Sequence, residues 1–175
     1  VALPICTLPS TIVASSGFDA MSHALETLTD ISYARRARQP RGTPRSPSQG
    51  ANPFSDMVAF EALSLIGKYL VRAVNDQSDE EARAEMMYAA TLAGIAFGNA
   101  GCHLPHGMSY AVSGLIKDYR APHYPQGEPF VPHGMSVVLN APSVYRFTAS
   151  ACPDRHLDRK STRLNSSHIP LSRMP

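Results

Sequence analysis

Two long stretches with the apolar period of an α-helix follow each other between residues 52 and 100, and they constrain the fold most. Asn52 and Pro53 are typical of a helix start, because asparagine caps free backbone amides and proline fits the first helical position. Apolar residues then follow at helical spacing: Phe54, Met57, Val58, Leu65, Ile66, Tyr69, Leu70 and Val74. The second stretch begins at Ser78 or Asp79, with an acidic first turn. Its apolar residues are Met86, Met87, Leu92, Ile95 and Phe97. Both stretches predict a mainly α fold.

A third helix is expected over residues 10–29, with Ser15 or Ser16 as its cap. It contains GFDAMSHALE, which places Asp19 and His23 four positions apart and therefore on one helix face. A carboxylate and an imidazole on one face of an otherwise apolar helix require a chemical reason.

Glycines late in the helical stretches lower helix stability, so we expect them to permit the close approach of another backbone. They are Gly94, Gly98 and Gly101. Gly114 is expected to end a further helix that begins near Cys102, and Pro132 to open the next apolar segment, which Pro142 bends or ends.

Three segments lack a helical pattern. Residues 33–52 are rich in arginine and proline and predict a flexible loop insertion, solvated rather than bound to nucleic acid because no aromatic residues interleave with the arginines. A polar, proline-rich loop is expected over residues 117–131. Residues 158–175, which include His168, show no apolar period and are expected to be an aberrant or disordered tail.

Composition excludes several classes of protein. The chain has 175 residues with 43% apolar content, enough for one core. Its formal net charge of +2 does not indicate a nucleic-acid partner, and no apolar run reaches the roughly 18 residues of a membrane span. Three scattered cysteines form no disulfide framework, which favours a reducing, intracellular compartment. Because the chain begins at Val1, it does not reveal whether a targeting peptide precedes it.

Two histidines share a local context that differs from the rest of the chain. His106 lies in LPHGMS and His133 in VPHGMS, and the glycine after each imidazole lets another group come close. If both converge on Asp19 and His23 within a helical bundle, one carboxylate and three imidazoles would suit a divalent first-row metal, with one position open for substrate.

Alternatives without a metal remain for each of these residues. Asp19 can serve as a helix charge with His23 as its hydrogen-bonded neighbour. Three roles stay open for His103: a fifth ligand, a partner of a ligand, or an exposed residue. His123 and His156 are expected to be ordinary core or surface residues, and Cys102 a small buried one.

Taken together, GFDAMSHALE, ANPFSD, GNAGCHLPHGMSYAVSG and VPHGMSVVLNAP resemble the iron-containing (group III) alcohol dehydrogenase family, most closely its hydroxyacid-oxoacid transhydrogenase branch. The resemblance covers about residues 3–157. It implies an N-terminal α/β nucleotide-binding domain, missing here, and an all-helical C-terminal domain, of which residues 1–157 would form a partial, metal-binding piece.

The resemblance also implies a ligand set and a reaction. Matched motif by motif, the metal ligands fall on Asp19, His23, His106 and His133. The metal is expected to be Fe(II), with zinc as the alternative, and NAD(H) would bind mainly to the missing domain. Hydride would pass from 4-hydroxybutyrate, through the nicotinamide, to 2-oxoglutarate. The chain alone is expected to be inactive.

Three features depart from the family pattern. Tyr110 stands where other branches have a histidine assigned to proton relay, and a phenol is a poor proton carrier near neutral pH. The segment between His106 and His133 is longer than in bacterial relatives, although the transhydrogenase branch shares this insertion. A glycine-rich phosphate-binding turn is absent from the 175 residues.

Two other functions stay open: a metal-dependent hydrolase that uses the same ligands with an activated water, and a non-catalytic helical interaction fragment. The expected partners are small hydroxy and oxo acids, with a homo-oligomer left open, and neither nucleic acid nor a membrane. The resemblance implies a mitochondrial location, and a cytoplasmic one is expected otherwise.

Overall fold

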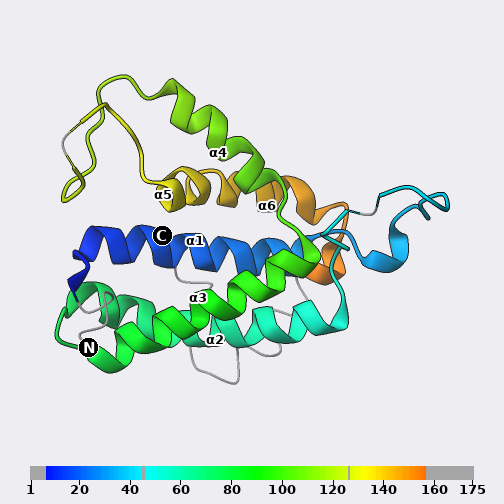
Figure 1. The fold of residues 1–175 in the computed structure, drawn as a ribbon, viewed down its shortest axis with the longest axis horizontal. Helices are drawn as coiled ribbons and strands as arrows, with labels where there is room; N and C mark the ends of the chain where they lie inside the picture. Colours follow the sequence, from blue (N-terminus) through cyan, green and yellow to red (C-terminus); the bar gives the residue numbers. More distant parts are fainter. Residues whose placement is uncertain (1–6, 45, 126, 157–175) are drawn as a thin grey trace.

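The computed structural model describes residues 7–44, 46–125 and 127–156, and these residues form a helical structure in two layers (Figure 1). Within them, no strand ladder occurs, only isolated bridges between Ser32 and Ala51 and between Arg120 and Phe130. The described helices are α1 (Ser10–Thr29), the short 3₁₀ helix η2 (Tyr33–Arg35), α2 (Pro53–Asn75), α3 (Glu80–Ala100), α4 (Leu104–Leu115), α5 (His133–Val138) and α6 (Ala141–Ala149). The prediction of a mainly α fold is confirmed. The proposed tail at residues 158–175 lies outside the described residues.

Helices α1, α2 and α3 form the core layer. Asn52 caps α2 with a reciprocal pair of hydrogen bonds to Ser55, and Pro53 occupies the first turn as expected. Asp79 caps α3 by accepting a hydrogen bond from the amide of Ala82. Both predicted helix starts are therefore confirmed. The core between these helices is built from small and apolar side chains, among them Ala24, Leu28, Ala59, Leu63, Ile66, Leu70, Met86 and Ala93.

Helix α1 covers the predicted residues, but the predicted cap is wrong. The helix begins at Ser10, because the carbonyl oxygen of Pro9 already accepts hydrogen bonds from the amides of Ile12 and Val13. Ser15 and Ser16 consequently lie inside the helix. Gly17 allows α2 to approach, since a side chain at this position would overlap Leu70.

Helices α4, α5 and α6 form a second layer on the side of α1 opposite to α2 and α3 (Figure 1). This layer buries less than the core does: Pro105 and Ser109 are the buried residues of α4. Helix α4 runs to Leu115, one residue past the predicted end at Gly114, and Pro142 lies in the first turn of α6 rather than ending α5. Helix α1 is therefore shared by both layers.

Some residues of the apolar stripes are exposed, and the predicted role of two glycines is wrong. Gly94 and Gly98 have no neighbouring atom within 4 Å of the place where a side chain would begin, so no backbone approaches them in the described structure. Gly101 instead adopts a positive φ of 122° at the end of α3, close to Asp30 and Ser48. The exposed residues of the predicted apolar stripes are Phe54, Met57, Met87 and Ile95.

No helix among the described residues combines the length and the apolar character that crossing a bilayer requires.

Candidate metal centre

Asp19 and His23 project from the same face of α1, toward the second layer. Nε2 of His23 lies 4.0 Å from Oδ1 of Asp19. The His23 ring is stacked between two other rings, at a centroid distance of 4.0 Å from Phe97 and 4.4 Å from His106. The spacing of four residues therefore places both side chains together, and neighbouring rings hold the imidazole in position.

His106 reaches this place from the first turn of α4. Its Nε2 lies 3.2 Å from Oδ1 of Asp19, and its Nδ1 lies 2.5 Å from Oε1 of Glu26, so the two nitrogens of the ring face two different carboxylates. The side chain is 14% exposed. Pro105, buried in the same turn, positions the start of the helix.

His133 reaches the same place as the first residue of α5, with Nε2 3.6 Å from Oδ1 of Asp19. Gly134 explains this closeness, because a Cβ there would overlap the carbonyl oxygen of Ser15 on α1. Only glycine lets the two helix backbones come so near. The side chain of His133 is 54% exposed, so this side of the cluster is open to solvent.

One oxygen atom, Oδ1 of Asp19, is thus shared by three imidazole Nε2 atoms at 3.2, 3.6 and 4.0 Å. Ligand atoms about 2.1 Å from a tetrahedral cation lie about 3.4 Å from one another. The separations from Oδ1 bracket this value, and one carboxylate with imidazole nitrogens is a donor set that suits a divalent first-row cation.

Two overlapping groups of donors lie close enough to hold a cation, each with its ligand atoms within 4.8 Å of one another. One comprises Asp19, His106 and His133, and the other His23, Cys102 and His106. Cys102 is half-buried, and burial raises the pKa of its thiol. The two groups share His106, and between them they contain Asp19 and all three of the predicted histidine ligands.

Burial and neighbouring charges shift the pKa values of the cluster in opposite directions. Burial alone would raise the pKa of Asp19. The hydrogen bond with His106 and the charges of the three histidines together outweigh burial, so the pKa of Asp19 is below its ordinary value. Burial lowers the pKa of His23 more than Asp19 raises it. Burial also lowers the pKa of His106, but hydrogen bonds with Asp19, Cys102 and Glu26 raise it to about 11. His106 must therefore release a proton before its Nε2 can bind a cation.

Sequence reasoning missed Glu26. This residue is fully buried, accepts a hydrogen bond from the backbone amide of His103 at 2.5 Å, and contacts His106. The signal was present in GFDAMSHALE, because positions 19, 23 and 26 are spaced four and then three residues apart and share one helix face.

The remaining histidines of the described residues point elsewhere. Nε2 of His103 lies 2.8 Å from the hydroxyl of Thr29, and His103 joins neither group of candidate ligands. His123 contacts the hydroxyl of Thr11, and His156 that of Thr148. Tyr110, one turn after His106, is 77% exposed.

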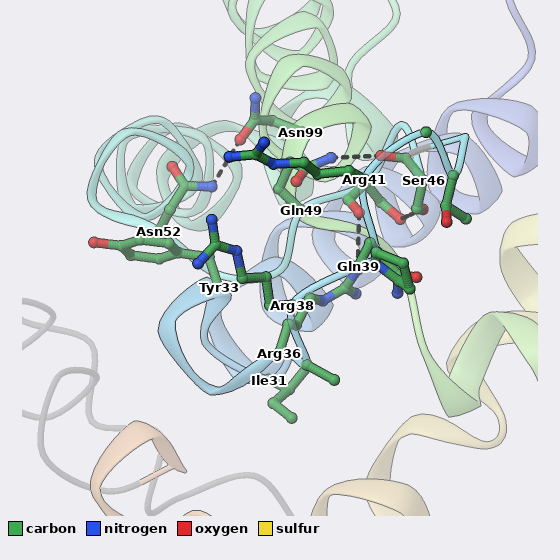
Figure 2. Close-up of a pocket in the computed structure, with 15 residues that line it drawn as sticks. Ile31, Tyr33, Arg36, Arg38, Gln39, Arg41, Ser46, Gln49, Asn52 and Asn99 are labelled. Atoms are coloured by element: carbon green, nitrogen blue, oxygen red, sulfur yellow. Dashed lines mark hydrogen bonds between the residues drawn. The ribbon is translucent and has the colours of Figure 1, made fainter.

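A separate cavity of about 970 Å³ lies beneath the arginine-rich loop (Figure 2). Arg36, Arg38 and Arg41 line it, together with Asn52 and Asn99, whose side chains form a hydrogen bond of 2.7 Å. Arg36 is held by a hydrogen bond to the carbonyl of residue 48, and no candidate metal ligand lines the cavity. The loop therefore packs against the ends of α2 and α3, away from Asp19.

One aspartate and three histidines that meet between helices make this a helical domain with a candidate metal site. The sequence matches the Fe-containing alcohol dehydrogenase family, C-terminal, over residues 46–165, and the chain belongs to this family. It is 51% identical over 158 residues to the mitochondrial hydroxyacid-oxoacid transhydrogenase of Mus musculus, covering 89% of this chain and 34% of that protein. The chain thus spans about a third of the length of such relatives.

Solved structures give the same result for the fold. An iron-containing alcohol dehydrogenase from Thermococcus thioreducens is 30% identical, with a TM-score of 0.62 over 86% of this chain and 30% of that one. A sulfoacetaldehyde reductase from Bifidobacterium kashiwanohense, in complex with NAD⁺, is 27% identical, with a TM-score of 0.59 over 81% and 30% of the two chains. The helical architecture is therefore that of the family's C-terminal domain.

Proposed function

We propose that this chain supplies the metal-binding part of an NAD-linked oxidoreductase that acts on hydroxy and oxo acids. The observation that carries the proposal is the meeting of Asp19 with the Nε2 atoms of His23, His106 and His133 within 3.2–4.0 Å. These four residues would be the metal ligands. Family membership supports an oxidoreductase over a hydrolase or a non-catalytic helical fragment.

When bound there, a divalent cation such as Fe(II), or zinc as the alternative, would act as a Lewis acid toward the hydroxyl or oxo oxygen of the substrate. The chain's own residues prepare this site. Asp19 supplies the negative charge, since its pKa is below the ordinary value, and burial lowers the pKa of His23, which favours the neutral imidazole that a metal ligand must be. The exposed side of His133 gives small acids access from solvent.

The substrates we propose are a 4-hydroxybutyrate-like hydroxy acid and a 2-oxoglutarate-like oxo acid, because the similar mouse protein is named a hydroxyacid-oxoacid transhydrogenase. Hydride would pass between them by way of NAD(H), held mainly by an α/β domain of the whole protein. The chain by itself would bind metal without turnover. Since that relative is named mitochondrial, we propose a mitochondrial location.

The test uses a whole protein that contains this segment. His106→Ala should abolish metal retention, measured by elemental analysis, and transhydrogenase activity together. His123→Ala is the matched control, because His123 contacts Thr11 and lies outside both donor groups, and it should change neither. Activity that persists in a metal-free His106→Ala protein would overturn the proposal.

A further inference from the structure

Glu26 is a buried carboxylate, and no lysine or arginine of the described residues forms a salt bridge with it. Its exposed fraction is 0%, and it lies on the α1 face that carries Asp19 and His23. Its partners are Nδ1 of His106 and the backbone amide of His103, each at 2.5 Å from one carboxylate oxygen. Burying a carboxylate costs free energy unless it is well hydrogen-bonded. These two contacts must therefore offset the cost of burying Glu26.

The contact with His106 determines which ring nitrogen faces the cluster. The Glu26 carboxyl already accepts a hydrogen bond from the backbone amide of His103, and if it also acts as the acceptor toward His106, the hydrogen of His106 is on Nδ1. A neutral imidazole has a single N–H, and the lone pair is then on Nε2. This is the nitrogen that lies 3.2 Å from Asp19.

The contact with His103 fixes the helix that carries His106. His103 precedes the first residue of α4, where backbone amides have no partner within the helix. A carboxylate at this end is also favoured by the helix dipole. Thr29, three residues after Glu26, contacts the side chain of His103. One turn of α1 therefore holds both the ring of His106 and the start of its helix.

From this arrangement we propose that Glu26 is a positioning residue for His106: it holds the hydrogen on Nδ1, directs Nε2 at the metal, and anchors the first turn of α4 to α1. The proposal rests on the proposed function, because it assigns a role toward the metal centre. Carboxylates behind metal-binding imidazoles fix ring orientation, and their loss lowers metal affinity by about 10- to 100-fold.

The variants separate positioning from bulk structure. In Glu26→Gln the shape is kept, but the amide group turns one donor toward another donor, either Nδ1–H of His106 or the amide of His103. Glu26→Ala removes both contacts. Glu61→Gln, an exposed glutamate of α2, is the matched control.

Co²⁺ is titrated into the full chain, with the visible spectrum reporting both affinity and ligand geometry and circular dichroism reporting helix content. We expect Glu26→Gln to bind Co²⁺ 10- to 100-fold more weakly than wild type with an altered spectrum, Glu26→Ala to be weaker still, and Glu61→Gln to match wild type. Equal affinity and an unchanged spectrum in Glu26→Gln would overturn the inference but leave the proposed function standing. Failure of the wild-type chain to bind Co²⁺ would count against the proposed function itself.

A measurement without any substitution covers the case in which the variants do not fold. In the Zn²⁺-loaded wild-type chain with ¹⁵N-labelled histidine, long-range ¹H–¹⁵N spectra distinguish the two ring nitrogens. The inference requires His106 to carry its hydrogen on Nδ1 and to bind through Nε2. Binding through Nδ1 would refute it.

Discussion

The chain contains the tetrapeptide His-Gly-Met-Ser twice, and the two copies reach the same aspartate in different ways. Each follows a proline and lies in the first turn of a helix, with His106 as the third residue of α4 and His133 as the first residue of α5. In both, the serine hydroxyl donates a hydrogen bond of 2.7 Å to the carbonyl of the histidine three residues earlier. The local backbone structure is therefore repeated.

The surroundings of the two copies differ. His106 is 14% exposed and is held from behind by Glu26, whereas His133 is 54% exposed. Its place is fixed by the backbone, since Gly134 packs directly against Ser15 of α1. Gly107, the equivalent glycine, has no atom within 4 Å of the place where a side chain would start.

The same motif is thus positioned by a neighbouring side chain in one copy and by helix packing in the other. In the first copy Glu26 holds the ring of His106, and Gly107 has open space beside it. In the second copy Gly134 is required by the contact with Ser15, and the ring of His133 is open to solvent. Substitutions at matched positions should therefore have unequal effects where the copies differ and equal effects where they agree.

The largest difference is expected between His106→Ala and His133→Ala. Both should weaken Co²⁺ binding, but His106→Ala also leaves the buried carboxylate of Glu26 without its imidazole, which costs about 3 kcal/mol of unfolding free energy. His133→Ala, at an exposed position, should change the unfolding free energy by less than about 0.5 kcal/mol. Urea unfolding of the metal-free chain measures both. Equal losses of stability would mean that Glu26 does not hold His106 differently from the way α1 holds His133.

The two glycines should respond with opposite signs. Gly134→Ala forces a Cβ into the carbonyl of Ser15 and should lower the unfolding free energy by about 2 kcal/mol, as overpacking does. Gly107→Ala meets open space in a helix and should raise it by about 0.5 kcal/mol. Thermal unfolding followed by circular dichroism distinguishes the pair. A stabilised Gly134→Ala variant would mean that α5 does not pack on α1 as described.

Local signals were enough to predict the long helices and the shared face of Asp19 and His23. Caps such as Asn52 and Asp79 act on their own backbone within three residues, so their effect can be read from the sequence. The family resemblance, rather than spacing, indicated that His106 and His133 would join them, because the sequence does not show how distant helices meet.

Other features depended on surroundings that the sequence does not display. An apolar period gives the spacing of a helix face but does not show which part of that face meets a neighbour, and Phe54 and Ile95 belong to such faces yet are exposed. Gly107 and Gly134 have identical neighbours in sequence and different neighbours in space. Glu26 was missed because a glutamate on a helix is usually a solvated charge.

The smallest effect is expected at the serines, where the two copies agree. Ser109 and Ser136 are both buried, and each hydroxyl is bonded within its own helical turn, independently of α1. Replacing either with alanine removes one neutral hydrogen bond but improves helix propensity, so each variant should lose no more than about 1 kcal/mol of unfolding free energy. The two losses should agree within the error of urea unfolding. If Ser136→Ala costs clearly more than Ser109→Ala, the packing of α5 on α1 depends on this hydroxyl, and the two copies differ in their local structure as well as in their surroundings.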